Sequence, residues 1–337
     1  MSYRGDFENV KLISSRSNQE LSNSVSKLLN IPLTNYISKK FANSELKVVI
    51  QDNIRSLDVF IIASGSQDDK YSINDHLMEV MLLIDACRMS SCRTITLILP
   101  FFPYSRSDKK DDGRVSIGGS LISRMLMMVN VDRIVSMDLH SGQIQGFMDK
   151  PFDNLFGINL HIKHFNENLF KNMSRSEINE NFVLVSPDNG GVKRIEAYAK
   201  KLEMKFIIMH KQRDYTKESV VDKSIIIGDK EDYKGKTAIV IDDMIDTMGT
   251  MVSASNALID EGISSVIIVA THGVFSGPAF DRINNCDSIN KVIVTNTLPQ
   301  NENIKMSEKL EVVDTSILFA EIIKKLVIGG SISALFE

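Results

Sequence analysis

The sequence has no tryptophan, few cysteines and little net charge, and two of these shortages exclude classes of protein. The missing tryptophan by itself excludes nothing. Three cysteines among 337 residues are odd in number and lack the spacing of a zinc site. They predict reduced, mostly buried thiols of an intracellular protein. A net charge of −4 argues against a nucleic-acid or membrane surface. Any binding of phosphate must therefore depend on local clusters of positive charge.

Long apolar segments are also missing. No apolar run approaches the roughly 20 residues that cross a bilayer, and the charged start MSYRGDFENVKLISS lacks the apolar core of a signal peptide. We therefore expect a cytoplasmic protein without a membrane partner. The shares of 43% hydrophobic and 24% charged residues are typical of globular proteins. A length of 337 residues favours about two domains.

Short apolar runs alternate with amphipathic stretches along most of the chain. Runs such as DVFIIAS, TITLILP and RIVSMDL predict strands that are covered on both faces. Helical spacing of apolar residues follows in stretches such as 72–88, and Ser17-Asn-Gln-Glu20 predicts a capping box. This alternation predicts an α/β fold with parallel sheets and right-handed crossovers. We expect two similar domains, 1–156 and 157–337, each a mainly parallel sheet flanked by helices, with the C-terminal tail as a candidate addition to the first.

The stretch TAIVIDDMIDTMGT (237–250) joins a buried strand to three carboxylates. Strand TAIVI brings Asp242 and Asp243 to the sheet edge, where open α/β sheets bind ligands. The turn from Asp246 to Thr250 then opens a helix, whose unpaired N–H groups and dipole suit a phosphate. The carboxylates would repel that phosphate unless they accept hydrogen bonds from another group, such as sugar hydroxyls. The alternative is an acidic cap on an ordinary helix.

A charged loop follows the strand TITLILP. SRSDKKDDGR (105–114) places four cations among three aspartates, and the aromatic stretch FFPY precedes it. Cations and aromatic faces together suit a polyphosphate that carries an adenine ring. The alternative is a solvated surface loop.

Polar residues also follow three other predicted strands. His140 of MDLHSGQ and Asp188 of SPDNGG would suit Mg²⁺, which keeps several waters and relies on substrate phosphates. Lys211 and Arg213 of HKQR precede the polar segment DYTKESVVD, which could form a lid that brings positive charge onto a transferring phosphoryl group. The alternatives are a structural histidine and a surface loop.

These motifs, in this order, resemble the ribose-phosphate pyrophosphokinase family, also called phosphoribosyl pyrophosphate synthetase. The resemblance covers nearly the whole chain and includes KKFANSE, FFPYSRSDKK, MDLHSGQIQGF, SPDNGG, VIDDMIDTMGT, THGVFSGPA and VTNTLPQ. It implies two phosphoribosyltransferase-like domains and a cytoplasmic, Mg²⁺-dependent enzyme of nucleotide biosynthesis. That enzyme makes 5-phosphoribosyl 1-diphosphate and AMP from ATP and ribose 5-phosphate. The family assembles dimers into hexameric rings, with phosphate and ADP as effectors.

The resemblance also implies roles for individual residues. ATP binding falls on Phe41, Asn43, Glu45, Arg106, Ser107, Asp111 and His140, and Mg²⁺ binding on His140 and Asp188. Ribose 5-phosphate binding falls on Asp242, Asp243, Asp246, Thr247, Met248, Gly249 and Thr250, and catalysis on Lys211, Arg213 and Arg106. A regulatory phosphate or ADP site falls on Arg55, Gln145, Asp153, Asn154, Ser331 and Ser333.

The chain departs from the usual family pattern at several positions, which include Asn53 and the stretch KDDGRVSIGG. Ser107 stands where many members have glutamine, Asn189 where SPDAGG is usual, and Gln212 where HKER is usual. Two other functions stay open at this point. One is a phosphoribosyltransferase that consumes the diphosphate, and the other is a catalytically silent regulatory subunit of a synthetase.

Overall fold

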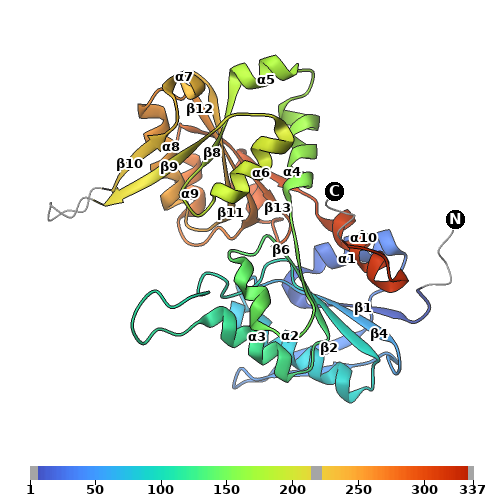
Figure 1. Ribbon diagram of the computed structural model, residues 1–337. Helices are drawn as coiled ribbons and strands as arrows, with labels where there is room; N and C mark the ends of the chain where they lie inside the picture. The colour runs from blue at the N-terminus through green and yellow to red at the C-terminus, as the bar shows by residue number, and fades with distance from the viewer. Residues whose placement is uncertain (1–6, 214–221, 333–337) are drawn as a thin grey trace. The chain divides into compact units, whose positions relative to one another are not determined.

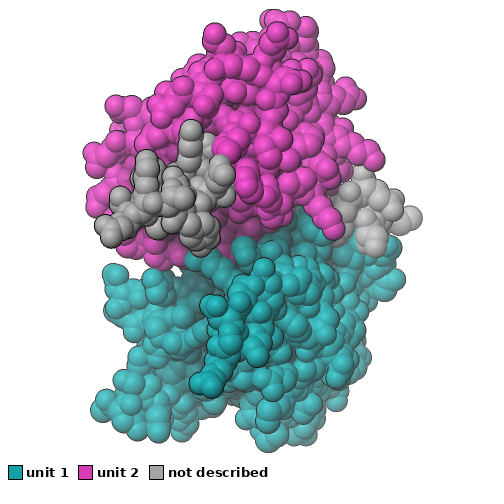
Figure 2. Space-filling model, turned by 60° about the vertical axis from the view of Figure 1, so that its left-hand side comes forward, with its two compact units in different colours: residues 1–156, 297–299, 314–337 teal, residues 157–296, 300–313 magenta. Residues whose placement is uncertain are grey.

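The computed structural model describes residues 7–213 and 222–332, with only the backbone at 211–213 and 222–224 (Figure 1). The chain forms two compact units, coloured separately in Figure 2. Unit 1 comprises residues 1–156, 297–299 and 314–337, and unit 2 comprises residues 157–296 and 300–313. The segment that begins at Asp314 therefore belongs to the same unit as the N-terminal half.

Unit 1 is built on a parallel sheet. Over its described residues the strand order is β1-β4-β5-β6-β7, and every neighbouring pair is parallel. The strands are β1 (Val10–Ser14), β4 (Asp58–Ile62), β5 (Thr94–Ile98), β6 (Arg133–Met137) and β7 (Phe152–Leu155). An antiparallel hairpin of β2 (Tyr36–Lys40) and β3 (Leu46–Ile50) is separate from this sheet. The predicted strands DVFIIAS, TITLILP and RIVSMDL are confirmed as β4, β5 and β6.

Helices cover the sheet of unit 1 and join its core. They are α1 (Gln19–Leu29), α2 (Ile73–Met89), α3 (Gly118–Met128) and α10 (Ser316–Ile328), with short 3-10 turns η1 (Arg16–Asn18) and η2 (Gly142–Phe147). The strands pack with α2 and α3 in one apolar cluster, and α10 packs against α1. The predicted capping box is wrong by one residue, because the Asn18 side chain, not Ser17, accepts from the Leu21 N–H and begins α1.

Unit 2 contains a larger sheet. In its described part the strand order is β10-β9-β8-β11-β12-β13-β14, parallel except for the β9–β10 pair. The strands are β8 (Phe182–Ser186), β9 (Phe206–Arg213), β10 (Asp222–Ile227), β11 (Thr237–Ile245), β12 (Ser265–Gly273), β13 (Ile289–Thr295) and β14 (Leu310–Val313).

Both faces of this sheet are covered. The helices are α4 (Ile158–His164), α5 (Arg175–Asn181), α6 (Val192–Leu202), α7 (Lys230–Tyr233), α8 (Gly249–Asp260) and α9 (Ala279–Asn284), with the π-turn η3 (Phe165–Leu169) and the 3-10 turn η4 (Asn303–Lys305). Ile239 and Ile241 of β11 pack with α6, whereas Ala238 and Val240 pack with α8. Alternate residues thus enter opposite cores, which explains the unbroken apolar runs. The α/β fold with mainly parallel sheets is confirmed. Among the described residues, no helix has both the length and the apolar character of a membrane span.

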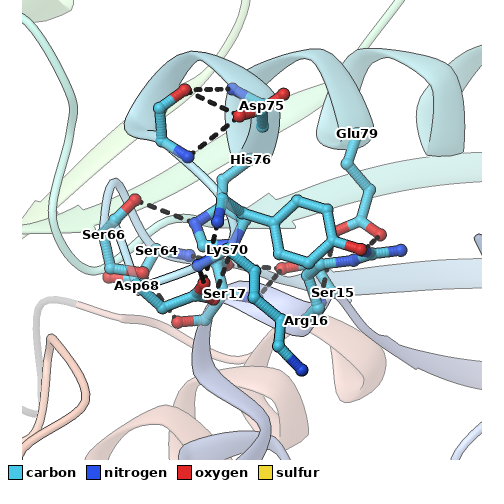
Figure 3. Close-up of polar contacts among 12 residues, drawn as sticks. Ser15, Arg16, Ser17, Ser64, Ser66, Asp68, Lys70, Asp75, His76 and Glu79 are labelled. Carbon is cyan, nitrogen blue, oxygen red and sulfur yellow. Dashed lines mark hydrogen bonds and ion pairs between the residues drawn. The ribbon is translucent and has the colours of Figure 1, made fainter. Parts of the chain in front are cut away.

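A buried ion pair ties η1 of unit 1 to α2 (Figure 3). The Arg16 Nε donates to Glu79 Oε1 at 2.8 Å, and the Glu79 side chain is fully buried. Arg16 also donates to the Ser38 carbonyl and stacks 4.1 Å above the centre of the Tyr71 ring. The Tyr36 hydroxyl lies 3.4 Å from the same carboxylate, whose charge, together with burial, raises the pKa of that tyrosine. Glu79 therefore depends on Arg16 for its charge balance.

We predict that Arg16→Met destabilises the protein by about 3–5 kcal/mol, because it leaves a buried carboxylate without its cation. Arg93→Met is the matched control: Arg93 is mostly exposed where it pairs with Asp58, and such surface pairs contribute about 1 kcal/mol or less. Urea unfolding followed by circular dichroism compares the two variants. Equal losses of unfolding free energy in the two variants would contradict the claim that burial of Glu79 makes the loss of its cation costly.

Candidate functional site

Strand β11 places the paired carboxylates within the sheet of unit 2. It pairs with β12 as far as Ile245, with Asp242 opposite Ala270. The prediction that strand TAIVI carries the two acids to the sheet edge stops two residues short, because backbone pairing continues past them to Ile245. Asp243 is buried, Asp242 and Asp246 are partly exposed, and Thr247 and Thr250 are exposed. The acids are thus held by a rigid strand, and the threonines that follow face solvent.

Arg194 of α6 bridges the two adjacent carboxylates. Its Nη1 donates to Asp242 Oδ1 and its Nη2 donates to Asp243 Oδ1, both at 3.1 Å. The Asp242 Oδ1 also accepts from the Asp243 backbone N–H at 2.8 Å. Because β8 and β11 are parallel neighbours, the helix that follows β8 starts beside the carboxyl end of β11. The fork of the guanidinium spans both acids, as lysine could not.

Ionisation of both Asp242 and Asp243 at once is energetically unfavourable. Burial, followed by the charge of Asp243, raises the pKa of Asp242 from 3.8 to about 7, although Arg194 opposes the shift. Burial and the neighbouring charge of Asp243 thus both disfavour the ionised form of Asp242. A ligand that donates hydrogen bonds to both carboxylates would favour the fully ionised pair.

The turn after β11 has the backbone shape of an anion site. Met248 has φ 65° and ψ −4°, in the left-handed region, and α8 begins at the next residue, Gly249. A left-handed residue followed by a helical one directs successive N–H groups into one concavity, called a nest, which binds anions. The N-cap residue of this helix is Met248, and its side chain makes no capping hydrogen bond. The N-cap residue is thus not an acid, and the first N–H groups of α8 are of the kind that donate to a phosphate.

Two other strands of unit 2 end in candidate residues. Asp188 is exposed after β8, and its Oδ1 accepts from the Gly191 N–H at 3.0 Å at the start of α6. A Cβ on Gly191 would lie 2.6 Å from the Ser186 hydroxyl, so this tight turn needs glycine. Asn189 contacts the His210 Nδ1 at 2.9 Å, which links the Asp188 turn to β9. The backbones of Lys211 and Arg213 lie in β9, and their side chains are outside the described residues.

In unit 1, Ser107 closes the charged loop after β5. Its hydroxyl donates to the Ser116 carbonyl at 3.0 Å and accepts from the Gly118 N–H at 2.9 Å, where α3 begins. Ser107 therefore fixes both ends of the loop. Arg106 and Asp111 are exposed.

His140 lies beyond the carboxyl end of β6 and is exposed. It follows Asp138, a non-glycine residue with φ 38°, and it precedes Gln143, which donates to Asp108 of the charged loop at 2.7 Å. The MDLHSGQ turn and the charged loop are therefore neighbours within unit 1. Such unfavourable backbone angles are common at functional sites.

The side chains of His140 and Asp188 suit a metal ion whose other ligands are water molecules and substrate phosphates. Within the described ranges, no group of three or more His, Cys, Asp or Glu side chains could hold a metal ion. His140 and Asp188 each offer a single exposed side chain. A Mg²⁺ ion fits this chemistry, since it keeps several waters and takes phosphate oxygens. A structural zinc site, with four protein ligands, does not fit.

The remaining candidates of unit 1 lie in two places. Phe41, Asn43 and Glu45 are exposed at the tip of the β2–β3 hairpin, closed by the Phe41 N–H bonded to the Glu45 carbonyl. For the regulatory candidates, Arg133 binds Asp153, Asn154 accepts from the Leu139 N–H at 3.1 Å, and Gln145 donates to the Gly142 carbonyl. Arg55 is exposed and Ser331 follows α10, whereas Ser333 lies outside the described residues.

Two arginines that contact the turn and its strand were not predicted as site residues. Arg194 lies 48 residues from Asp242, and Arg282 donates to the Thr247 carbonyl at 2.6 Å across 35 residues. Neither lies at a strand end, which was the signal used to select candidates. The clue that was available is the placement of Arg194 in the first turn of the helix that follows SPDNGG.

Comparisons with known proteins agree over most of the chain. A family model described as the N-terminal domain of ribose phosphate pyrophosphokinase matches residues 10–129, and one described as the phosphoribosyl synthetase-associated domain matches residues 224–337. The crystal structure of phosphoribosylpyrophosphate synthetase from Mycobacterium smegmatis is 38% identical, with a TM-score of 0.85, and the match covers 96% of this chain and 100% of that one. An adenine phosphoribosyltransferase from Saccharomyces cerevisiae is 18% identical over 38% of this chain and 73% of its own, with a TM-score of 0.30, which is too low to support a conclusion.

We predict that Asp242→Asn stabilises the protein more at pH about 8 than at pH about 5. With a raised pKa in the folded state, the wild type keeps its full stability below 3.8 and loses it as the pH rises toward 7, a loss that asparagine avoids. Thermal unfolding at the two pH values should show the variant's advantage growing by a few degrees.

Asp58→Asn provides the control for this pH dependence. Its hydrogen bond with Arg93 lowers the pKa of Asp58, so this carboxyl is ionised in both states between pH about 5 and 8. The difference between that variant and the wild type should stay constant over the same range. A constant difference for Asp242→Asn as well would contradict the raised pKa of Asp242.

Proposed function

Because this chain belongs to the ribose-phosphate pyrophosphokinase (phosphoribosylpyrophosphate synthetase) family, we propose that it is an active ribose-phosphate diphosphokinase. The reaction transfers the β,γ-diphosphoryl group of ATP to the C1 hydroxyl of ribose 5-phosphate. The products are 5-phosphoribosyl 1-diphosphate, used for nucleotide biosynthesis, and AMP.

The site at the end of β11 carries this proposal. It combines a pair of hydrogen-bond acceptors, Asp242 and Asp243, with a helix start a few residues further on, where the N-cap residue Met248 makes no side-chain capping bond. A sugar phosphate carries groups that match both features. Its vicinal hydroxyls donate to carboxylates, and its phosphate accepts from backbone N–H groups. We assign Asp242, Asp243 and Asp246 to the hydroxyls, and the nest and hydroxyls of residues 247–250 to the 5-phosphate.

The chemistry requires positive charge rather than a protein nucleophile. The C1 hydroxyl oxygen forms a bond to the β-phosphorus and loses its proton to water. The bond from that phosphorus to the oxygen that bridges it to the α-phosphorus breaks, and AMP leaves with that oxygen. Phosphoryl transfer depends mainly on positioning and charge neutralisation. We propose that Lys211, Arg213 and Arg106 neutralise the negative charge of the diphosphoryl group while it is transferred. His140 and Asp188 would hold Mg²⁺, which when bound neutralises phosphate charge.

For ATP we propose groups of unit 1 that are exposed, together with the partly buried Ser107. These are Phe41, Asn43 and Glu45 of the hairpin, Arg106, Ser107 and Asp111 of the charged loop, and His140. Because the Ser107 hydroxyl already joins the start of the loop to Ser116 and Gly118 at its far end, we propose that Ser107 acts by shaping the loop.

Further proposals concern regulation and assembly. Arg55, Gln145, Asp153, Asn154, Ser331 and Ser333 are proposed to bind phosphate or ADP. We propose a cytoplasmic homo-oligomer of dimers in a hexameric ring, in which each of the two compact units corresponds to a domain with a phosphoribosyltransferase-like design.

Two other functions are less well supported. A phosphoribosyltransferase would use the β11 turn but leaves the family match over residues 10–129 without a role. A silent regulatory subunit would have no need of the costly carboxylate pair that Arg194 holds together. An active synthetase accounts for both observations.

The decisive assay incubates the protein with ATP, Mg²⁺ and ribose 5-phosphate, with and without inorganic phosphate. We expect AMP to form only when the sugar phosphate is present, and chelation of Mg²⁺ should stop it. Diphosphate release that depends on an added base would instead indicate a phosphoribosyltransferase. No turnover alone, with increased activity of an added synthetase, would indicate a regulatory subunit.

We also predict that Lys211→Ala lowers kcat far more than it weakens ribose 5-phosphate binding. Removal of a cation that acts mainly in the transition state can cost on the order of 10³-fold in rate. Steady-state kinetics give kcat, and calorimetry gives the dissociation constant of the sugar phosphate. Lys201→Ala, an exposed lysine at the end of α6, is the control and should leave both values unchanged. A normal kcat in Lys211→Ala would refute the assignment.

A further inference from the structure

Arg282 of helix α9 binds the backbone of the phosphate turn, the turn at residues 246–250 that we propose binds the 5-phosphate. Its Nη1 donates to the Thr247 carbonyl oxygen at 2.6 Å. A Cβ built on Gly249 would lie 3.2 Å from the same nitrogen, so the guanidinium rests against the first residue of α8. This close approach is a reason for glycine at position 249. Arg282 thus contacts the turn both before and after Met248.

This contact fixes the orientation of one peptide unit, the one between Thr247 and Met248. The described peptide bonds are all trans, and in a planar trans peptide the C=O and N–H point in opposite directions. When Arg282 holds the Thr247 carbonyl on the side of α9, the Met248 N–H points away from α9. Met248 is the left-handed residue of the nest, so its N–H is one of the groups that converge there.

The left-handed conformation of Met248 needs support. It costs roughly 1–2 kcal/mol for a residue other than glycine. Its side chain is almost completely buried and packs in the core with Met251, Phe275 and Ile283. The bond from Arg282 adds a restraint on the preceding peptide. Core packing therefore holds the side chain, and Arg282 fixes the direction of the backbone dipole.

We propose that Arg282 is a positioning residue for the 5-phosphate of ribose 5-phosphate, which it serves by orienting the Thr247–Met248 peptide without touching the sugar. The assignment rests on the proposed function of this turn. It predicts that loss of Arg282 weakens sugar-phosphate binding and leaves ATP binding unchanged.

The surroundings of Arg282 allow a chemical test. The side chain is exposed and lines a cavity of about 740 Å³ between α8 and α9, together with Val252, Asn256 and Asp281. When the side chain is removed, a small guanidinium ion could enter from this cavity and donate to the same carbonyl. A residue that only stabilises α9 would not respond in this way.

The experiment compares Arg282→Ala, Arg282→Lys and the control Asp281→Asn, whose side chain lines the same cavity. Calorimetry should show ribose 5-phosphate binding weakened by about tenfold or more in Arg282→Ala, as expected for loss of a hydrogen bond from a charged group. Lysine should retain part of the affinity, and Asp281→Asn all of it. The KM for ATP should stay unchanged, and low concentrations of methylguanidinium should restore binding only in Arg282→Ala.

Each outcome bears on one claim. Unchanged ribose 5-phosphate affinity in Arg282→Ala, with AMP formation intact, overturns the role of Arg282 and leaves the proposed function standing. A wild type that binds the sugar phosphate but makes no AMP overturns the function, while the affinities still test Arg282. If Arg282→Ala does not fold, wild-type affinity in Arg282→Lys with the KM for ATP raised would overturn the assignment.

Discussion

The bridge from Arg194 to Asp242 and Asp243 is the interaction on which the polar end of β11 depends. A strand inside a sheet can hold two adjacent carboxylates only if their charge is balanced, because burial penalises ionised groups. One guanidinium does this for both acids, with each terminal nitrogen at 3.1 Å from a different carboxylate. The rise in the pKa of Asp242 shows that the balance is incomplete. The pair is thus rigidly placed and still ready to accept hydrogen bonds.

A second constraint follows at the turn. The chain leaves a regular strand and starts a helix within three residues, and the left-handed Met248 makes this possible. Burial of that side chain in the core supports the unfavourable backbone angles. The stability of unit 2 therefore maintains the shape of an anion site that local sequence alone would not favour. Preorganisation of this kind spares a ligand the cost of ordering the turn when it binds.

Local patterns predicted much of the fold and selected the candidate site. Unbroken apolar runs revealed β4, β5, β6, β8 and β11, and the strand-end rule selected 242–250. The short strands β7 and β14, of four residues each, were missed because so few residues carry little pattern. The end of β11 was placed two residues too early, because its last residues, Met244 and Ile245, are held by pairing with β12, which a single sequence does not display. For the same reason the roles of Arg194 and Arg282 were not foreseen.

Charge shows why those two arginines matter together. The segment from Asp242 to Thr250 has three carboxylates and no lysine or arginine, so alone it would repel a phosphate. Arg194 reaches it from α6 and meets the carboxylates, while Arg282 reaches it from α9 and meets the backbone of the turn. The positive charge that a phosphate site requires is therefore supplied by the tertiary structure. The proposed sugar-phosphate site therefore needs no basic sequence motif, because the fold brings together groups that are 35 to 48 residues apart.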